Sequence, residues 1–185
     1  TERIRPTDDT DVICEVSGRA GYRTLGIRLE ELGLRQSARH GDPPYRWRTQ
    51  DGDVLDVMPT SSEVLGFSNR WYDPGTTLTV RKELEDGLTV RLLAPPFYLA
   101  SKIEAYRNRG HSDPFGSPDF EDIVVLLASR RQIVREVETA GDPVRSWLRT
   151  RIAELFPESR IYERLAAHLP VRDLEGLAAT VRDRI

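Results

Sequence analysis

The chain has 185 residues and a formal net charge of −3 at pH 7, with 27 basic and 30 acidic residues. This length suits one medium domain, or a core domain with a small helical annex. A net charge this close to zero does not indicate nucleic-acid binding. The single cysteine, Cys14, excludes both a disulfide framework and a zinc site made of thiolates. No apolar run approaches the roughly 20 residues that a membrane-spanning helix needs. We therefore expect a cytoplasmic protein with no membrane partner.

The first half of the chain predicts strands and one amphipathic helix. Residues 11–16 form a short β-branched run typical of a buried strand, and three leucines at helical spacing predict a helix over residues 22–32. A turn at Asp51-Gly52 separates two further strands and predicts a hairpin. A short helix or loop is expected at residues 61–69. The other expected strands are 45–49, 54–58, 76–80 and 88–93.

The second half predicts helices. Pro95-Pro96 ends the last strand and favours a helix over residues 97–109, because proline suits a first helical turn. Ser117-Pro118-Asp119 is a strong helix start, and that helix is expected to reach residue 128. Residues 132–185 are helical in pattern, with breaks at Gly141-Asp142-Pro143, Pro157 and Pro170. Strands followed by helices indicate an α+β fold, with a core sheet in residues 1–94 and a helical region in residues 95–185.

Asp9 and Asp11 lie two residues apart at the entry of the first strand. Residues at this spacing in a strand point to the same side, so the two carboxylates converge. Two carboxylates at close range repel each other unless a cation lies between them, and oxygen-only ligands favour Mg²⁺. The alternative interpretation is a polar turn before a strand, where aspartate is common.

Asp56 strengthens the metal hypothesis. It lies in an otherwise apolar strand, Val54-Leu55-Asp56-Val57-Met58, where aspartate is disfavoured and rarely buried without a partner. A third carboxylate on a neighbouring strand would complete a ligand set for two divalent ions, which can activate an attacking hydroxyl and stabilise a leaving oxygen. The alternative is a solvent-facing aspartate beside the Asp51-Gly52 turn.

Two further charged groups lie on the predicted helices. Lys102 flanks an apolar stripe of Leu99, Ile103 and Tyr106, where its ammonium could neutralise triphosphate charge; the alternative is a solvated surface lysine. Asp119 and Asp122 are three residues apart, which places them on one helix face. Asp119 also suits the positive end of the helix, and Asp122 could pair with an arginine or with Lys102 and so orient the lysine.

These motifs, taken in order, resemble the AbiEii/MenT-type nucleotidyltransferases of the polymerase-β-like superfamily. Four motifs show the resemblance: Arg-x-Thr-x-Asp-x-Asp leading into a strand, a lone aspartate in a later strand, Leu-Ala-x-Lys-x-x-Ala, and Asp-x-x-Asp-Ile-x-x-Leu. The resemblance extends from Arg5 to Leu127, and the remaining residues match only in their helical pattern. It implies a mixed sheet of the nucleotidyltransferase type flanked by helices, with a helical C-terminal region.

The resemblance also implies roles for individual residues. Asp9 and Asp11 would bind Mg²⁺, and Asp56 would be the third acid and the base. Lys102 would be part of the catalytic and nucleotide site with Asp119 or Asp122, and Arg5 and Thr7 would touch phosphate. Family members use nucleoside triphosphates and act as toxins of toxin–antitoxin pairs, and some add nucleotides to the 3′ end of tRNA. A tRNA acceptor and a cognate antitoxin protein are therefore the partners that the resemblance implies.

The family's phosphate-binding turn has no counterpart between Thr1 and the aspartate pair. That turn is Gly-Gly or Gly-Ser, it lies upstream of the pair, and it supplies backbone N–H groups to the phosphates, whereas this sequence begins at Thr1. We expect turnover to depend on such a turn, and a native protein without it to be inactive. Two alternatives therefore stay open: a non-catalytic nucleotide- or protein-binding member of the fold, and a small-molecule nucleotidyltransferase of the aminoglycoside-modifying kind.

Overall fold

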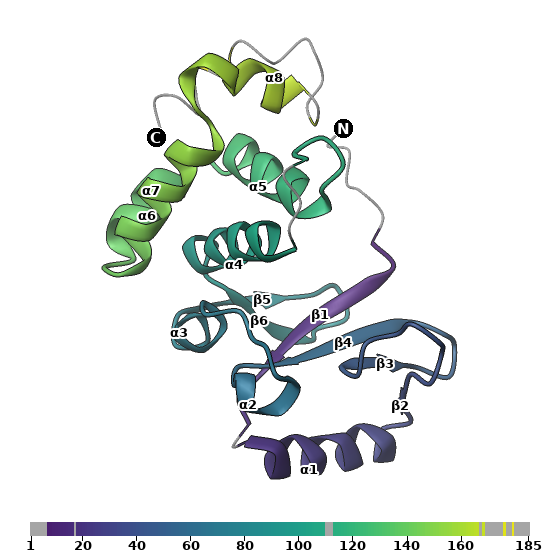
Figure 1. Cartoon of the computed structure of the whole chain (residues 1–185). Coiled ribbons are helices and arrows are strands. Elements are labelled where there is room, and N and C mark those ends of the chain that lie inside the picture. The colour runs from purple at the N-terminus through teal and green to yellow at the C-terminus, as the bar shows by residue number, and fades with distance from the viewer. Residues whose placement is uncertain are drawn as a thin grey trace. The chain divides into compact units, whose positions relative to one another are not determined.

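The computed structural model describes residues 7–16, 18–109 and 113–166, together with residues 168, 176 and 179. The chain divides into two compact units, Thr1–Thr76 and Thr77–Ile185. The first contains a mixed four-stranded sheet with helices, and the second is mostly helical (Figure 1). The α+β class expected from the sequence is thereby confirmed. Among the described residues, no helix is both long enough and apolar enough to cross a membrane.

The sheet of the first unit has the strand order β1-β4-β3-β2. Strand β1 runs parallel to β4, whereas β3 is antiparallel to both β4 and β2. The hairpin expected around Asp51-Gly52 is β3–β4, and Gly52 has the positive φ of 97° that suits glycine in such a turn. Strand β2 was not expected. The bounds are Asp9–Cys14 for β1, Arg35–Gln36 for β2, Arg46–Arg48 for β3 and Val54–Pro59 for β4.

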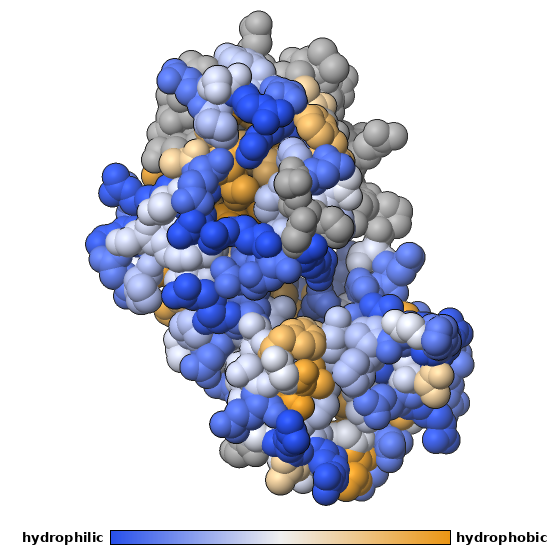
Figure 2. All heavy atoms as spheres, viewed as in Figure 1, coloured by the Kyte–Doolittle hydropathy of each residue, from blue (hydrophilic) through white to orange (hydrophobic). Residues whose placement is uncertain are grey.

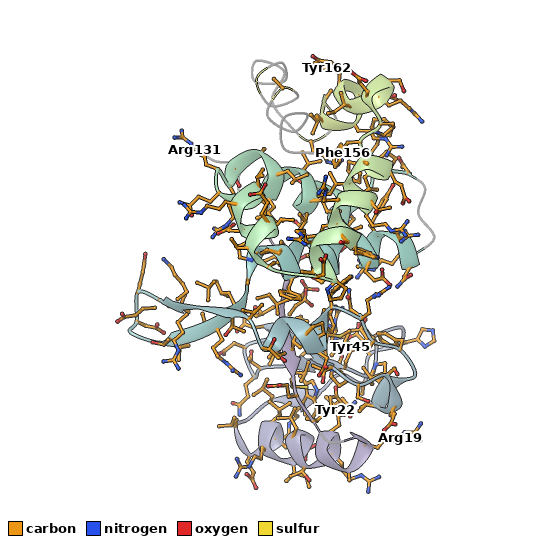
Figure 3. All side chains as sticks on the ribbon, turned by 90° about the vertical axis from the view of Figure 1, so that its left-hand side faces the viewer. Arg19, Tyr22, Tyr45, Arg131, Phe156 and Tyr162 are labelled. Atoms are coloured by element: carbon orange, nitrogen blue, oxygen red, sulfur yellow. The ribbon has the colours of Figure 1, made fainter. Side chains whose placement is uncertain are left out.

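Helix α1, Gly18–Glu31, packs against one face of this sheet (Figure 1). The hydroxyl of Tyr22 donates a hydrogen bond of 2.8 Å to the backbone oxygen of Val57, and Figure 3 shows Tyr22 pointing from the helix toward the strands. Gly26 lies against the buried ring of Trp47, where an added Cβ would come within 3.4 Å of a ring carbon. The face occupied by α1 is therefore the one that carries Trp47 and Val57.

Two short helices complete the first unit. Helix α2, Ser62–Leu65, is capped by Ser61, whose side chain accepts from the backbone N–H of Glu63. Helix α3, Tyr72–Thr76, was not expected from the sequence. The turn that leads into α3 is fixed by Asn69, whose side-chain oxygen accepts from the backbone N–H of Trp71 at 3.1 Å.

The second unit begins with a hairpin that forms a two-stranded sheet of its own, with β5 at Thr79–Glu83 and β6 at Thr89–Leu93. The sequence had instead favoured a single core sheet spanning residues 1–94 that included both strands. The difference arises because β5 and β6 pair only with each other among the described strands. Val80 and Leu92 face each other across the hairpin and are about half exposed, at 46% and 49%.

Helices form the core of the second unit. The apolar stripe predicted for α4 is buried, with Leu99 and Ile103 fully enclosed. Helix α4 packs against α5, whose Phe120 and Ile123 are also fully buried. The ring of Phe120 lies 5.4 Å from that of Phe156, which is labelled in Figure 3. The bounds are α4 Pro95–Asn108, α5 Pro118–Ser129, α6 Ile133–Thr139, α7 Val144–Leu155, η1 Glu158–Arg160 and α8 Ile161–Ala166.

Polar groups dominate the coloured surface visible in Figure 2. This agrees with the mean hydropathy of −0.49 and with charged residues making up 31% of the chain. The expected helical pattern beyond Ala166 falls almost entirely outside the described residues.

Candidate functional site

Three carboxylates share one face of the sheet in the first unit. Strands β1 and β4 are parallel with Asp11 opposite Asp56, and Asp9 lies two residues before Asp11 on the same strand. Because side chains alternate along a strand, all three project from the same face. Val57 and Trp47 alternate with these positions, so the carboxylate face is opposite the face covered by α1. The structure thus places the three acids that the sequence singled out on one face of the sheet.

Arg46 of β3 is the partner of Asp56. The two residues are opposite each other in the antiparallel β3–β4 pair. The Nε of Arg46 donates to Oδ1 of Asp56 and the Nη2 donates to Oδ2, each at 2.8 Å. The same Nη2 donates to Oδ2 of Asp9 at 3.2 Å. Asp56 is only 5% exposed, so its burial is matched by a side-on, two-point ion pair.

The ion pair sets the protonation of Arg46. The hydrogen bond with Asp56 raises the pKa of Arg46 above its usual value, and the negative charges of Asp56, Asp42 and Asp9 act in the same direction against the cost of burial. The guanidinium therefore remains a cation at every accessible pH. It is a permanent positive charge among the three carboxylates.

A second arginine of strand β3, Arg48, forms ion pairs next to Arg46. Arg48 donates from Nη2 to Oδ2 of Asp42 at 2.9 Å, and Ser37 also donates its hydroxyl proton to that oxygen. Asp42 in turn lies 3.7 Å from Nη1 of Arg46 through its other oxygen. The hydrogen bonds from Ser37 and Arg48 hold the pKa of Asp42 below its usual value. Asp42 is thus an ionised carboxylate beside the outer edge of Arg46.

Thr7 supports Asp9 directly. Its hydroxyl lies 2.9 Å from the backbone oxygen and 3.2 Å from Oδ1 of Asp9, and it donates to them. This contact restrains the carboxylate at the start of β1. Arg5, which was also selected from the sequence, lies outside the described residues.

The oxygen donors of this face are of the kind that Mg²⁺ prefers, but they are not arranged around a common point. Every candidate ligand is a carboxylate oxygen, the type that hard divalent cations prefer. Among the residues whose placement is described, however, no three or more His, Cys, Asp or Glu side chains converge closely enough to hold a metal ion. The guanidinium of Arg46 instead engages both oxygens of Asp56 and one of Asp9.

The second unit holds a separate polar cluster between α4 and α5. The Nζ of Lys102 lies 2.7 Å from Oδ2 of Asp122 and 3.8 Å from Oδ1 of Asp119. Arg109 donates to the other oxygen of Asp119 at 2.8 Å. Asp119 is 4% exposed, so it is a buried acid with two cationic neighbours. The pair of Lys102 and Asp122, one of the two pairings considered from the sequence, is present in the structure.

Burial and the neighbouring negative charges shift the pKa of Lys102 in opposite directions. Burial lowers the pKa of its ammonium, but the hydrogen bond to Asp122 and the nearby negative charges outweigh that effect and raise the pKa above its usual value. The ammonium also lies 5.6 Å from the ring centre of Tyr98, within the range of a cation–π contact. Lys102 is therefore a fixed cation whose side chain is 22% exposed.

Cys14 is not an activated thiol. Burial raises its pKa to about 11, although a backbone hydrogen bond acts in the opposite direction. A nucleophilic cysteine needs the reverse shift, toward the thiolate. Cys14 is therefore unsuited to act as a nucleophile at neutral pH.

Arg46, Asp42 and Arg109 were not selected from the sequence. The sequence does contain a pattern that predicts the position of Arg46: a hairpin that turns at Asp51-Gly52 places residue 46 opposite residue 56. The two-point contact with Asp56 follows from that register. No comparable local signal marks Arg109, whose contact with Asp119 joins the end of α4 to the start of α5 across an intervening loop.

Comparisons of the chain with protein-family models, with curated proteins and with solved structures gave no match. Functional assignment therefore depends on the residues themselves and on the two clusters described above, one in each unit.

Proposed function

We propose that this protein is a Mg²⁺-dependent nucleotidyltransferase. The observation that carries the proposal is the register of β1 and β4, which aligns Asp11 with Asp56 and places Asp9 on the same face. Three carboxylates from two adjacent strands, on the face opposite the covering helix, repel one another, and Arg46 offsets part of that repulsion through Asp56 and Asp9. Their shared placement supports a role in binding cations.

The reaction would transfer a nucleotidyl group from a nucleoside triphosphate. The oxygen of an acceptor hydroxyl forms a bond to the α-phosphorus, the bond from that phosphorus to the bridging oxygen breaks, and pyrophosphate leaves. Asp56 takes the hydroxyl proton as the oxygen attacks. Thr7 restrains the carboxylate of Asp9 at the entry of β1.

Asp9, Asp11 and Asp56 would hold Mg²⁺. When bound, the ion would offset the negative charge of the phosphates and favour ionisation of the attacking hydroxyl.

Lys102 of the second unit is a candidate phosphate-binding cation in its own right. Its raised pKa keeps the ammonium charged at neutral pH, and its partial exposure leaves it accessible. Asp122 and Asp119 hold the side chain in place, so their role is to position Lys102. A fixed ammonium loses less conformational entropy on binding phosphate than a free lysine does.

The acceptor and the biological role come from the family resemblance. We propose an RNA acceptor, with the 3′ end of tRNA as the first candidate, and a toxin activity that a cognate antitoxin protein restrains. Both extend the nucleotidyltransferase proposal, which stands without them.

Incubation with each of the four radiolabelled nucleoside triphosphates and total RNA tests the proposal. We expect label transfer with at least one nucleotide, loss of transfer after chelation, and recovery when Mg²⁺ is restored. Asp11→Ala is expected to abolish transfer, whereas Asp51→Asn, in the turn of the same sheet, is expected to leave it intact. Absence of transfer by the wild type, or equal transfer by Asp11→Ala, would reject the proposal.

One observation favours a second candidate, a non-catalytic nucleotide- or protein-binding module. The ion pairs of Arg46 give Asp56 and Asp9 a structural partner within the sheet. Calorimetric titration with Mg²⁺ and each triphosphate separates the two candidates: binding without any transfer supports the module, and binding with transfer supports the enzyme.

A further inference from the structure

We propose that Arg109 is a positioning residue for Lys102: by binding the buried carboxylate of Asp119, it keeps the ammonium of Lys102 next to Asp122 and accessible to an anionic ligand. This inference deepens the proposed function and rests on it, because it concerns how the candidate phosphate-binding cation is held. The contacts that carry it all lie in the second unit, between α4 with its C-cap residue and the start of α5.

The first argument is that Asp119 needs a cation. This residue is only 4% exposed, and a buried charge that loses its partner destabilises a protein strongly. Two cations are close to it. Nη1 of Arg109 donates to Oδ2 at 2.8 Å, whereas Nζ of Lys102 lies 3.8 Å from Oδ1, which is beyond hydrogen-bonding distance. Arg109 is therefore the residue that neutralises Asp119 most directly.

The second argument is that Lys102 has two acidic neighbours that differ in their exposure. Its Nζ makes the shorter contact, 2.7 Å, with Asp122, whose side chain is 21% exposed, compared with 6% for Asp119. The two acids are three residues apart on α5, so one ammonium can reach both of them. The acid that holds Lys102 more closely therefore decides whether the ammonium lies toward solvent or toward the protein interior.

The third argument is the charge of the cluster. Lys102 and Arg109 are cations and Asp119 and Asp122 are acids, so the four side chains together are neutral. Without Arg109 the cluster would carry one net negative charge, and Lys102 would be the remaining cation beside Asp119 among the described residues. Attraction to that buried carboxylate would draw the ammonium inward, and the net charge would repel phosphate. Both effects would make Lys102 less available to an anion.

Helix α4 offers a matched control in Arg107. It lies in the last turn of α4, is exposed and carries the same charge as Arg109, whereas the guanidinium bound to Asp119 is that of Arg109. The side chain of Arg109 is itself 60% exposed, so its replacement by glutamine removes little packing. The chain also has only two lysines, Lys82 and Lys102, and Lys82 is exposed on β5. Lys82 therefore serves as an internal reference for the reactivity of Lys102.

The test is acetylation of the folded protein with acetic anhydride at pH 8, followed by mass spectrometry of its peptides, which gives the rate at Lys102 relative to Lys82. The reagent acylates the uncharged amine, so a closer carboxylate and the loss of a neighbouring cation both slow the reaction. We expect Arg109→Gln to lower this ratio by about threefold. Arg107→Gln should stay within about 1.5-fold of the wild type, because its charge is screened by solvent. An unchanged or higher ratio in Arg109→Gln overturns the inference.

Two further variants keep the test decisive. If Arg109→Gln does not fold, Arg109→Lys retains the charge with a shorter reach, and we expect its ratio to fall by about 1.5-fold to twofold; a ratio equal to or above the wild type overturns the inference. In an Asp119→Asn protein the buried charge is gone, so adding Arg109→Gln should change the ratio by less than about 1.5-fold. A full threefold fall in that protein would show that Arg109 does not act through Asp119, which also overturns the inference.

The outcomes separate this inference from the proposed function. If the ratio falls as expected but calorimetric titration detects no nucleoside triphosphate bound to the wild type, the positioning of Lys102 stands and its proposed ligand is rejected. If the wild type transfers nucleotides but Arg109→Gln leaves the ratio unchanged, the inference fails and the proposed function stands.

Discussion

Arg46 contacts Asp56 through two parallel hydrogen bonds of 2.8 Å, across the β3–β4 pair in which the two residues are directly opposite. The contact explains how an aspartate is tolerated in an otherwise apolar central strand. It also joins three strands, since the same guanidinium reaches Asp9 of β1. The stability of the first unit and the chemistry proposed for it therefore depend on the same side chains.

Replacement of Asp56 by alanine should destabilise the protein. Arg46 would lose its two-point partner but keep Asp9 and Asp42, so the cost should be smaller than for a fully isolated buried charge. We expect the free energy of unfolding to fall by about 2 kcal/mol, measured by urea denaturation. Asp53→Ala, in the exposed turn, is the control and should change it by less than about 0.5 kcal/mol. Equal stability of the two variants would contradict the structural role of the ion pair.

Lys102 and Asp122 should be energetically coupled. The pair is 2.7 Å apart, and each side chain is only about a fifth exposed, at 22% and 21%. A double-mutant cycle with Lys102→Met and Asp122→Asn should give a coupling free energy of about 1 kcal/mol. The more exposed pair of Arg151 and Glu154 on α7 should give less than about 0.5 kcal/mol. Independent effects of the two α4–α5 substitutions would show that the contact does not hold Lys102.

The start of α5 depends on Ser117. Its hydroxyl oxygen accepts from the backbone N–H of Phe120 at 3.3 Å, and Pro118 occupies the first helical position. Ser117→Ala should reduce the free energy of unfolding by about 1 kcal/mol, whereas Ser117→Asp should retain the cap. The helix also carries Asp119 and Asp122, so its first turn positions the partners of Lys102. No loss of stability in the alanine variant would contradict this cap.

Cys14 should react slowly at neutral pH. Burial raises the pKa of the thiol to about 11, so at pH 8 only about one molecule in a thousand carries the thiolate. The rate of alkylation by iodoacetamide should rise with pH up to about 11 in the folded protein, and level off near pH 9, the ordinary range of a thiol, in urea. A folded-state profile that levels off at the same pH as the unfolded one would contradict the assigned environment.

The raised pKa of Cys14 also determines how the thiol affects protein stability as the pH rises. The unfolded thiol loses its proton at lower pH than the folded thiol, so ionisation favours the unfolded state as the pH rises. The contribution of Cys14 to stability should therefore decline between pH 9 and about 11. Cys14→Ser should remove this component of the alkaline dependence.

Local patterns were enough to predict most of the elements. The apolar stripe of Leu99 and Ile103 identified α4, and Ser117-Pro118 identified the start of α5, because helix periodicity and capping are short-range properties. Strand β2 and helix α3 were missed because each is very short and is held by contacts with other segments. The Asp51-Gly52 turn predicted the β3–β4 hairpin.

The candidate site was predictable only in part. The spacing of Asp9 and Asp11 was enough to place them on one face, whereas the alignment of Asp11 with Asp56 depends on a parallel pairing between residues 45 positions apart in the chain. Sequence spacing does not determine such a pairing. The contact of Arg46 with Asp56 follows from the hairpin register. The burial of Asp119 beside Arg109 instead depends on the packing of α4 on α5.

The most direct test of the central claim is the rate of nucleotidyl transfer by Asp11→Asn relative to the wild type, in the presence of Mg²⁺ and RNA. Asp11 is exposed on β1, so the amide should preserve the fold while removing one of the charges proposed to bind Mg²⁺. We expect the rate to fall by at least about a hundredfold, while Asp51→Asn retains the wild-type rate. Undiminished transfer by Asp11→Asn would contradict the assignment of the carboxylate face as the catalytic metal site.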